Sequence, residues 1–373
     1  MNITISKNEL NSSLQAVMHA VSSTSPQPYL RGIRITADGE GLVLTGSNAD
    51  ISIQMNMQRN DSNDLNIIEE GSILIDGKVL TEIVRKLDSE TISIEVIDGA
   101  LTKFSGHSAL FRINGMNPSD YPDIDFSKPP VSFTLKAADM ISIIDQTVFA
   151  AAPKDTRPVL TGVNFKLEGG VLTVTSTDSF RLSKKTVSVD SAETFNITIP
   201  SRSLNELKST VLTDPEAMIE ISLNSRKAEF ISAGIIFQTK LLDGSYPETD
   251  RLIPKEFNRE MMIDRMDLIR AIDRNTFIRT ENQAINRLQC SENEIVLTNR
   301  SQEIGDSQEV LSADFTGEEL DISFSAQYVI EACRAIGSEN IKIRFTGEMK
   351  PFIITDPADD SLIELVLPVR TYN

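Results

Sequence analysis

The sequence predicts an α+β fold in which one β-α-β…β-α-β unit is repeated three times in tandem. One phrase occurs three times: GSILIDGKVLTEIVRKLDSETISIEV from Gly71, FNITIPSRSLNELKSTVLTDPEAMIEISL from Phe195 and LDISFSAQYVIEACRAIGSENIKIRFTG from Leu320. A second phrase also occurs three times: ITISKNELNSSLQAVMHAV, FTLKAADMISIIDQTVFAA and MMIDRMDLIRAIDRNTFIR. The two phrases alternate along the chain of 373 residues, so the unit is about 120 residues long, an ordinary domain size.

Each first phrase contains an alternating strand, a short polar step, a helix of about three turns, a turn and a second alternating strand. A strand also precedes the helix in each second phrase. The apolar spacing places equivalent residues on one helix face. In the first phrases these are Val79, Leu80, Ile83 and Leu87, then Ser203, Leu204, Leu207 and Val211, then Tyr328, Val329, Ala332 and Ile336. In the second phrases they are Leu10 and Leu14, Met140 and Ile144, and Leu268 and Ile272.

Proline and glycine mark the expected domain boundaries. One lies near Lys128-Pro129-Pro130 after GMNPSDYPDID, and the other near Pro254-Lys255 within the related DGSYPETDRLIP. We therefore expect domains at residues 1–128, 129–253 and 254–373. An open tandem array is one reading of such repeats, but three whole domains with two helices each favour closure into a ring.

The charge balance first argues against a general nucleic-acid binder, because 36 basic and 54 acidic side chains give a net charge of −18. The objection weakens if the basic residues gather on one surface. They recur beside the helices, as Arg85, Lys86, Arg202, Lys208, Arg270, Arg274 and Arg334. Solvated helix faces explain them equally well from charge alone. Equivalent helices in a ring would direct these faces to one centre, where loose contact with a duplex backbone is expected.

No catalytic motif is present in the sequence, which has only two histidines and two cysteines. There is no phosphate-binding loop, nucleophile elbow, dinucleotide fingerprint or metal-ligand spacing, so we predict a non-enzyme without cofactor or metal. His19 takes the place of Phe149 and Phe277 in the other repeats and is expected to be a packing residue. Cys290 and Cys333 are expected to be buried thiols. Sparse cysteine, no signal-like start and no long apolar run favour a cytoplasmic protein without a membrane partner.

Five stretches resemble one known family: TRPVLTGVNF, TDSFRLS, DGSYPETDRLIP, FTGEMKPFII and the terminal LVLPVRTYN. In this order and over the whole chain, the sequence resembles the bacterial DNA polymerase III beta subunits, the sliding clamps. The resemblance implies a head-to-tail homodimer that forms a closed six-domain ring, with helices lining the hole and sheets outside. It implies a processivity factor of DNA replication with no cofactor, acting at the nucleoid. The implied partners are duplex DNA, the replicative polymerase, the clamp loader, and repair polymerases that carry short Leu/Phe peptides.

The resemblance also implies three sets of site residues. A peptide-binding groove between the second and third domains is assigned to Arg157, Leu160, Thr177, Ser179, Phe180, Arg181, Leu182, Pro247, Arg251, Leu252, Ser325, Tyr328, Met349, Pro351, Leu365, Val366, Leu367, Pro368, Val369 and Arg370. The dimer interface is assigned to Phe111, Ile113, Phe277 and Ile278. The DNA-facing residues are Arg85, Lys154, Lys208, Arg274 and Arg334.

Two departures from the family pattern affect these assignments. Ser179 and Phe180 stand where relatives commonly have Gly and His, which bears on the preferred peptide. Ser25 stands in a loop where relatives often have a basic residue, and Lys154 is the expected substitute. Two other classes compete with the clamp: a hydrolase or transferase with acidic catalytic residues on a repeated scaffold, and a surface adhesin of β domains. The missing catalytic motifs oppose the first, and the lack of a signal peptide opposes the second.

Overall fold

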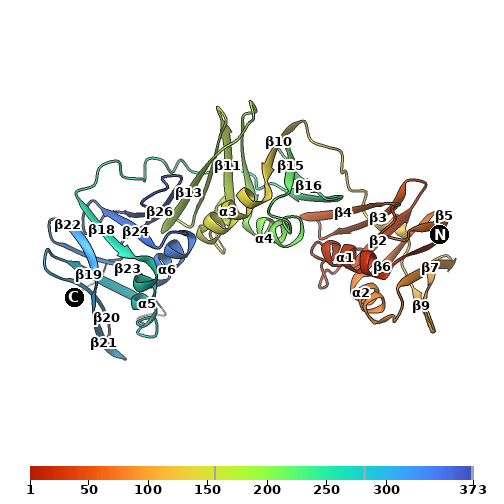
Figure 1. The fold of residues 1–373 in the computed structure, drawn as a ribbon, viewed down its shortest axis with the longest axis horizontal. Helices are drawn as coiled ribbons and strands as arrows, with labels where there is room; N and C mark the ends of the chain where they lie inside the picture. Colours follow the sequence, from red (N-terminus) through yellow and green to blue (C-terminus); the bar gives the residue numbers. More distant parts are fainter. Residues whose placement is uncertain (155–156, 280–282, 371–373) are drawn as a thin grey trace. The chain divides into compact units, whose positions relative to one another are not determined.

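A computed structural model describes residues 1–154, 157–279 and 283–370 (Figure 1). Its contacts divide the chain into two compact units. Unit 1 contains residues 1–140 and 202–241, and unit 2 contains residues 141–201 and 242–373. These units follow packing, so the domain boundaries expected at 128/129 and 253/254 stay a prediction. None of the helices in the described residues is long and apolar enough to cross a membrane.

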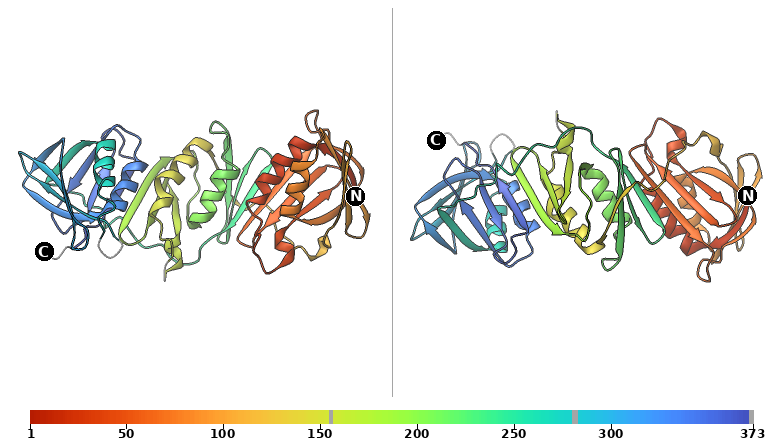
Figure 2. Two further views of the ribbon diagram at one scale, coloured as in Figure 1. Left: turned by 90° about the horizontal axis from the view of Figure 1, so that it is seen from below. Right: turned by 90° about the horizontal axis from the view of Figure 1, so that it is seen from above.

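Unit 1 contains two antiparallel sheets. The five-stranded sheet has the order β5 (Asn66–Glu69), β1 (Asn2–Ser6), β7 (Thr91–Asp98), β8 (Leu101–Gly106) and β9 (Ala109–Asn114). The eight-stranded sheet has the order β10 (Val131–Lys136), β15 (Met218–Leu223), β16 (Lys227–Ser232), β17 (Ile235–Lys240), β4 (Ile51–Gln58), β3 (Gly41–Ser47), β2 (Gly32–Ala37) and β6 (Gly71–Asp76). Helices α1 (Lys7–Met18) and α2 (Gly77–Lys86) lie side by side (Figure 2), and α4 spans Ser201–Thr210.

Unit 2 repeats this plan. Its nine-stranded sheet has the order β14 (Phe195–Pro200), β11 (Gly162–Glu168), β12 (Val171–Thr177), β13 (Arg181–Ser188), β26 (Leu362–Val366), β25 (Phe352–Thr355), β24 (Asn340–Phe345), β18 (Arg259–Asp264) and β22 (Ala313–Gly317). Its four-stranded sheet has the order β21 (Gly305–Leu311), β20 (Ile295–Ser301), β19 (Ile285–Cys290) and β23 (Leu320–Ser325). Helices α5 (Arg265–Asp273) and α6 (Ala326–Ala335) pack together, and α3 spans Ala137–Thr147 where the units meet in sequence.

The element order confirms the predicted repeat. The strand–helix–strand steps are β1-α1-β2, β6-α2-β7, β10-α3-β11, β14-α4-β15, β18-α5-β19 and β23-α6-β24. The two larger sheets each join strands of different repeats: β4 pairs with β17, and β13 pairs with β26. Each pairing covers two strand edges that would otherwise be open to association with other chains.

The predicted helix faces lie in the cores, with two exceptions. Leu10, Leu14, Met140, Ile144, Leu268 and Ile272 are buried, as are the first-phrase positions except Val79 and Tyr328. Val79 is exposed and Tyr328 is half-buried. Both cysteines are buried, and burial raises the pKa of Cys290 and of Cys333 to about 12. Their thiols are therefore neutral core groups, as predicted.

His19 is not a packing residue, so that expectation was wrong. Its side chain is 39% exposed at the end of α1. Its Nδ1 lies 2.8 Å from Oε2 of Glu206 on α4. The comparison with Phe149 and Phe277 failed because equivalent positions of the repeats are not equally packed, and Phe277 is itself 65% exposed. The residue opposite it comes from another repeat, and a polar neighbour there favours a polar side chain.

Candidate functional site

A tight turn between β12 and β13 forms the centre of the predicted groove. Asp178 Oδ1 accepts hydrogen bonds from the backbone nitrogens of Phe180 (2.9 Å) and Arg181 (3.0 Å). Thr177 Oγ1 donates to the carbonyl of Arg181 at 2.5 Å. Ser179 has a φ of 76°, a region that glycine adopts without strain. The turn directs Phe180 outward, where it is 59% exposed.

Arg181 lies beneath this turn and is 8% exposed. Its Nε is 3.0 Å from Asp178 Oδ2, its Nη1 forms a short ion pair with Glu331 of α6, and its Nη2 donates to the carbonyl of Phe149 at 2.6 Å. Phe149 belongs to the short helix η3 (Val148–Ala150). One buried guanidinium thus joins the turn, α6 and η3. This is the environment of a positioning residue, since three of its five N–H donors are already used within the chain.

An aromatic pair connects the turn to α6. The rings of Phe180 and Tyr328 are stacked with centroids 6.5 Å apart and an interplanar angle of 21°. The Arg181 guanidinium lies 4.6 Å from the Tyr328 centroid, within cation–π distance. Burial raises the pKa of Tyr328. The exposed Phe180 ring is therefore held in place by Tyr328, which in turn contacts Arg181.

The terminal segment runs between this turn and β23. Leu367 donates its backbone nitrogen to the carbonyl of Phe180 (2.9 Å), and Val369 donates to the carbonyl of Ser323 (2.8 Å). A small core below contains Leu182, Ile353 and Leu365, with the partly buried Ile253, Phe257, Ile363 and Leu367 against it. The segment that the sequence placed in the groove is therefore fixed at two points, and its role in the groove stays a prediction.

The predicted groove residues differ in accessibility. Leu160, Thr177, Arg181, Leu182, Leu365 and Val366 are buried; Ser325, Tyr328, Pro351, Leu367, Pro368 and Val369 are half-buried; Arg157, Ser179, Phe180, Pro247, Arg251, Leu252, Met349 and Arg370 are exposed. All of them belong to unit 2. The exposed and half-buried groups have the surface that a peptide can contact, and the buried groups support it. The groove assignment as a whole stays a prediction.

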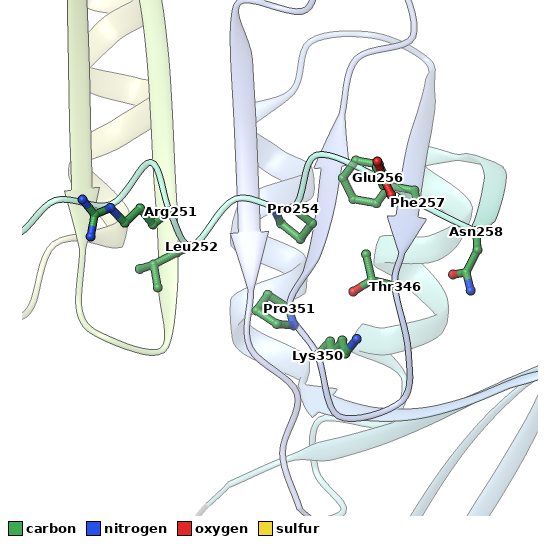
Figure 3. A pocket seen from close by; sticks show the side chains of 9 residues that line it. All are labelled: Arg251, Leu252, Pro254, Glu256, Phe257, Asn258, Thr346, Lys350 and Pro351. Atoms are coloured by element: carbon green, nitrogen blue, oxygen red, sulfur yellow. The ribbon is translucent and has the colours of Figure 1, made fainter.

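A pocket of about 490 Å³ adjoins these residues, and the sequence did not predict it as a whole. Arg251, Leu252 and Pro351 line it and are also predicted groove residues; Pro254, Glu256, Phe257, Asn258, Thr346 and Lys350 complete it (Figure 3). The segment LIPKEFN, residues 252–258, spans the predicted boundary and supplies most of the pocket wall. Its apolar Leu, Pro and Phe were the sequence signal that could have identified the pocket.

Glu364 is a buried acid on β26, the strand that also contains the predicted groove residues Leu365 and Val366. It is 1% exposed, and Ser183 Oγ lies 2.9 Å from its Oε1 and 2.5 Å from the carbonyl of Gln146. Burial raises the pKa of Glu364 well above its usual range, against the opposing hydrogen bond from Ser183 and charge of Arg181. The folded chain therefore favours the protonated carboxyl.

We expect Glu364→Gln to stabilise the protein increasingly as the pH rises. Well below pH 4.5 the carboxyl is protonated in both the folded and the unfolded chain, so ionisation costs little. Above this pH the unfolded chain releases the proton first, and the wild type loses stability until the pH passes the folded pKa. Each unit of raised pKa corresponds to about 1.4 kcal/mol. Thermal melts between pH 4.5 and 8 measure the difference; a difference that does not change with pH contradicts the assignment.

Two sheet edges carry exposed apolar side chains. On β9, Leu110 is 45% and Phe111 38% exposed. In unit 2, Val310 on β21 is 59% exposed, and Phe277 after α5 is 65% exposed. Of the other predicted interface residues, Ile113 is half-buried and Ile278 is buried within its own chain at 3% exposure. The sequence missed Leu110 and Val310 because strand alternation alone does not identify which strands lie at an edge.

The predicted DNA-facing residues are mostly at the surface. Arg85 is 62% exposed and pairs with Glu82 at 2.7 Å within α2. Arg274 is 56% exposed, and its Nε lies 3.1 Å from Glu309 of β21. Lys154 and Arg334 are exposed, and Lys208 is half-buried. At least two of the five cations are therefore engaged with carboxylates of their own chain, which lowers the attraction of this set for phosphate.

In residues 1–154, 157–279 and 283–370, no group of three or more His, Cys, Asp or Glu side chains could hold a metal ion. His107 belongs to a turn and has a φ of 43°.

Three family models match the chain in order. They are the DNA polymerase III beta subunit N-terminal domain at residues 1–125, the central domain at 134–248 and the C-terminal domain at 250–370. Among similar curated proteins, the "Beta sliding clamp" of Bacillus subtilis strain 168 is 36% identical over 379 residues. That of Halalkalibacterium halodurans is 37% identical over 381 residues. In both cases all of this chain and all of the relative are covered.

Solved structures of similar fold belong to the same family of proteins. The crystal structure of the Bacillus subtilis DNA polymerase sliding clamp has a TM-score of 0.96 at 36% identity, with both chains fully covered. The DNA polymerase III beta chain of Streptococcus pneumoniae has a TM-score of 0.95 at 31% identity, covering 99% of this chain and 100% of that one. The similarity therefore extends over the entire length and the entire fold.

Proposed function

The chain belongs to the bacterial DNA polymerase III beta subunit family, and from this premise we propose how its surfaces serve a sliding clamp. It is a processivity factor for DNA polymerase and does not itself catalyse a reaction. Such a factor acts through effective concentration. A polymerase held weakly on a clamp that remains on DNA rebinds the primer end before it diffuses away.

The proposed assembly is a head-to-tail homodimer that closes around duplex DNA. It is supported by the free strands β9 and β21, each at the edge of a smaller sheet and each carrying exposed apolar residues. Pairing β9 of one chain with β21 of its partner would give a sheet like the nine-stranded one within unit 2. A head-to-tail contact made twice closes a two-chain ring. These free edges are the observation that carries the proposal.

The proposed contact with DNA is loose and independent of sequence. Arg85, Lys154, Lys208, Arg274 and Arg334 are assigned as phosphate neighbours in the ring. Pairing of Arg85 with Glu82 and of Arg274 with Glu309 reduces the net attraction. Weak attraction suits a sliding protein, because tight phosphate contacts would hold it at one position. Encirclement, rather than affinity, then keeps the clamp on DNA.

The proposed docking site for partners is the groove around Phe180 and Tyr328. Apolar Leu252, Met349 and Leu367 offer contacts to Leu or Phe side chains of a short peptide, and Arg157 and Arg370 can orient its polar groups. We assign the replicative polymerase, the clamp loader and repair polymerases to this site. The clamp loader would also open the ring. Since duplex DNA is the object held, we place the protein at the nucleoid in the cytoplasm.

Retention on circular DNA tests encirclement directly. We expect protein placed by a clamp loader on nicked circular DNA to remain bound through gel filtration in high salt, and to be released when the DNA is linearised. Electrostatic binding falls by orders of magnitude with rising salt, so retention in high salt requires a topological link. Loss from circular DNA as rapid as from linear DNA would contradict the closed ring. Light scattering should give about twice the 41.2 kDa of one chain.

A further inference from the structure

A pocket of about 490 Å³ lies beside the groove. Its size lies within the range of small-ligand sites, roughly 300–1,000 Å³. Figure 3 shows Lys350 and Pro351 on one side and Glu256 and Phe257 on the other, with Arg251 and Leu252 on the segment that leads to Pro254. The walls thus come from two separate segments, residues 251–258 and the turn between β24 and β25.

The pocket is continuous with the groove. Leu252, which is 53% exposed, and the half-buried Pro351 belong to both. Phe257 packs against the small core of Leu182, Ile353 and Leu365, the same core that supports the groove. A peptide that covers Leu252 and Pro351 in the groove therefore reaches the pocket by continuing a few residues.

The charges around the pocket favour an anionic ligand. Arg251 is 88% exposed, and its partner Glu248 is exposed and 3.7 Å away, so their ion pair contributes little. Within the described residues, no carboxylate lies within ion-pair distance of Lys350. The Arg344 guanidinium lies 4.8 Å from the Phe257 centroid, and its buried Nε has no hydrogen-bond partner. Glu256 is the one acid among the lining residues. Local positive charge is notable in a chain of net charge −18.

We propose that this pocket is a further subsite of the groove, which binds an apolar residue next to an Asp or Glu in the segment that flanks a partner's groove-binding motif. The apolar side chain packs against Leu252, Phe257 and Pro351. The carboxylate pairs with Lys350. The proposal rests on the proposed function of the groove, and it adds a preference for flanking residues that the groove alone does not give.

Fluorescence anisotropy with labelled peptides tests this subsite. A short peptide carries only a Leu-Phe motif. Two longer peptides add Phe-Glu after a short spacer, one at each end, and their controls add Ser-Gln. We expect one Phe-Glu peptide to bind the wild-type dimer about tenfold more tightly than the short peptide, a change of about 1.4 kcal/mol.

Two charge-reversal variants locate the gain. Lys350→Glu should abolish it and leave the affinity of the short peptide unchanged. Lys255→Glu is the matched control, because Lys255 is exposed in the same segment, does not line the pocket and undergoes the same charge change. It should keep most of the gain. The proposal is overturned if neither extension tightens binding, if Lys350→Glu keeps the gain, or if both variants lose it equally.

The same data separate the pocket from the groove. If only an extended peptide binds and Lys350→Glu abolishes its binding, the pocket stands and the groove assignment fails. If the short peptide binds and the extension adds nothing, the groove stands and the pocket fails. Absence of binding by every peptide overturns both proposals.

Discussion

Replacing Phe111 with aspartate should convert the dimer into a monomer. Phe111 lies on β9 opposite the fully buried Phe104 of β8, so its ring borders the core and is partly exposed at the sheet edge. In the proposed assembly the partner chain covers it. Aspartate removes this apolar contact and buries a charge, at a cost of about 3 kcal/mol or more. The substitution is present at both interfaces of the two-chain ring. The affinity of each interface should fall by ~100-fold or more.

Sedimentation or light scattering over a range of protein concentrations measures the effect. Phe277→Asp provides an independent version, because Phe277 is 65% exposed and its replacement costs the single chain little. Ile68→Asp is the control: Ile68 is 64% exposed on β5, at the opposite edge of the same sheet as β9. It should remain a dimer. If Phe111→Asp and Phe277→Asp both stay dimeric, β9 and the surface at Phe277 do not form the contact.

The repeats made much of the fold predictable. Positions such as Leu10, Leu14, Leu268 and Ile272 recur at helical spacing and are buried. The pairing of strands across repeats was not predictable in the same way. Contacts such as Ile53 with Phe237 join residues far apart in sequence, and strand alternation does not specify a partner.

At the site, the residue roles that the family resemblance implied differ in part from the contacts in the structure. Matching TDSFRL to the family located the turn, yet it gave Arg181 the role of a peptide contact and left Glu331 out. The ion pair between them depends on α6 meeting β13, which local sequence does not encode. His19 failed for a similar reason, since Glu206 comes from another repeat. The pocket as a whole was missed because its walls combine residues of DGSYPETDRLIP and FTGEMKPFII with Glu256, Phe257 and Asn258, which lie outside both stretches.

Replacing Arg181 with alanine should both destabilise the protein and weaken peptide binding. Arg181 is buried, and its loss leaves Asp178 and Glu331 without their cation. Removing one partner from a buried ion pair costs about 3–5 kcal/mol. The turn that presents Phe180 and the helix that carries Tyr328 would lose their common anchor. We expect a clear fall in Tm and a loss of peptide affinity of about tenfold or more.

Arg251→Ala is the matched control for stability. It is also an arginine assigned to the groove, but it is 88% exposed and pairs with the exposed Glu248. Surface pairs of this kind contribute about 0–1 kcal/mol, so its Tm should stay close to that of the wild type.

Glu331→Gln separates positioning from direct contact. Glu331 is not an assigned groove residue, yet it anchors Arg181 from α6. If Arg181 acts by holding the turn against α6, this variant should lower peptide affinity in the same direction as Arg181→Ala. The double variant Arg181→Ala with Glu331→Gln should then lose less affinity than the two single variants combined, because the two residues act as one contact. Unchanged affinity in Glu331→Gln, together with lost affinity in Arg181→Ala, would instead mean that the guanidinium touches the peptide itself.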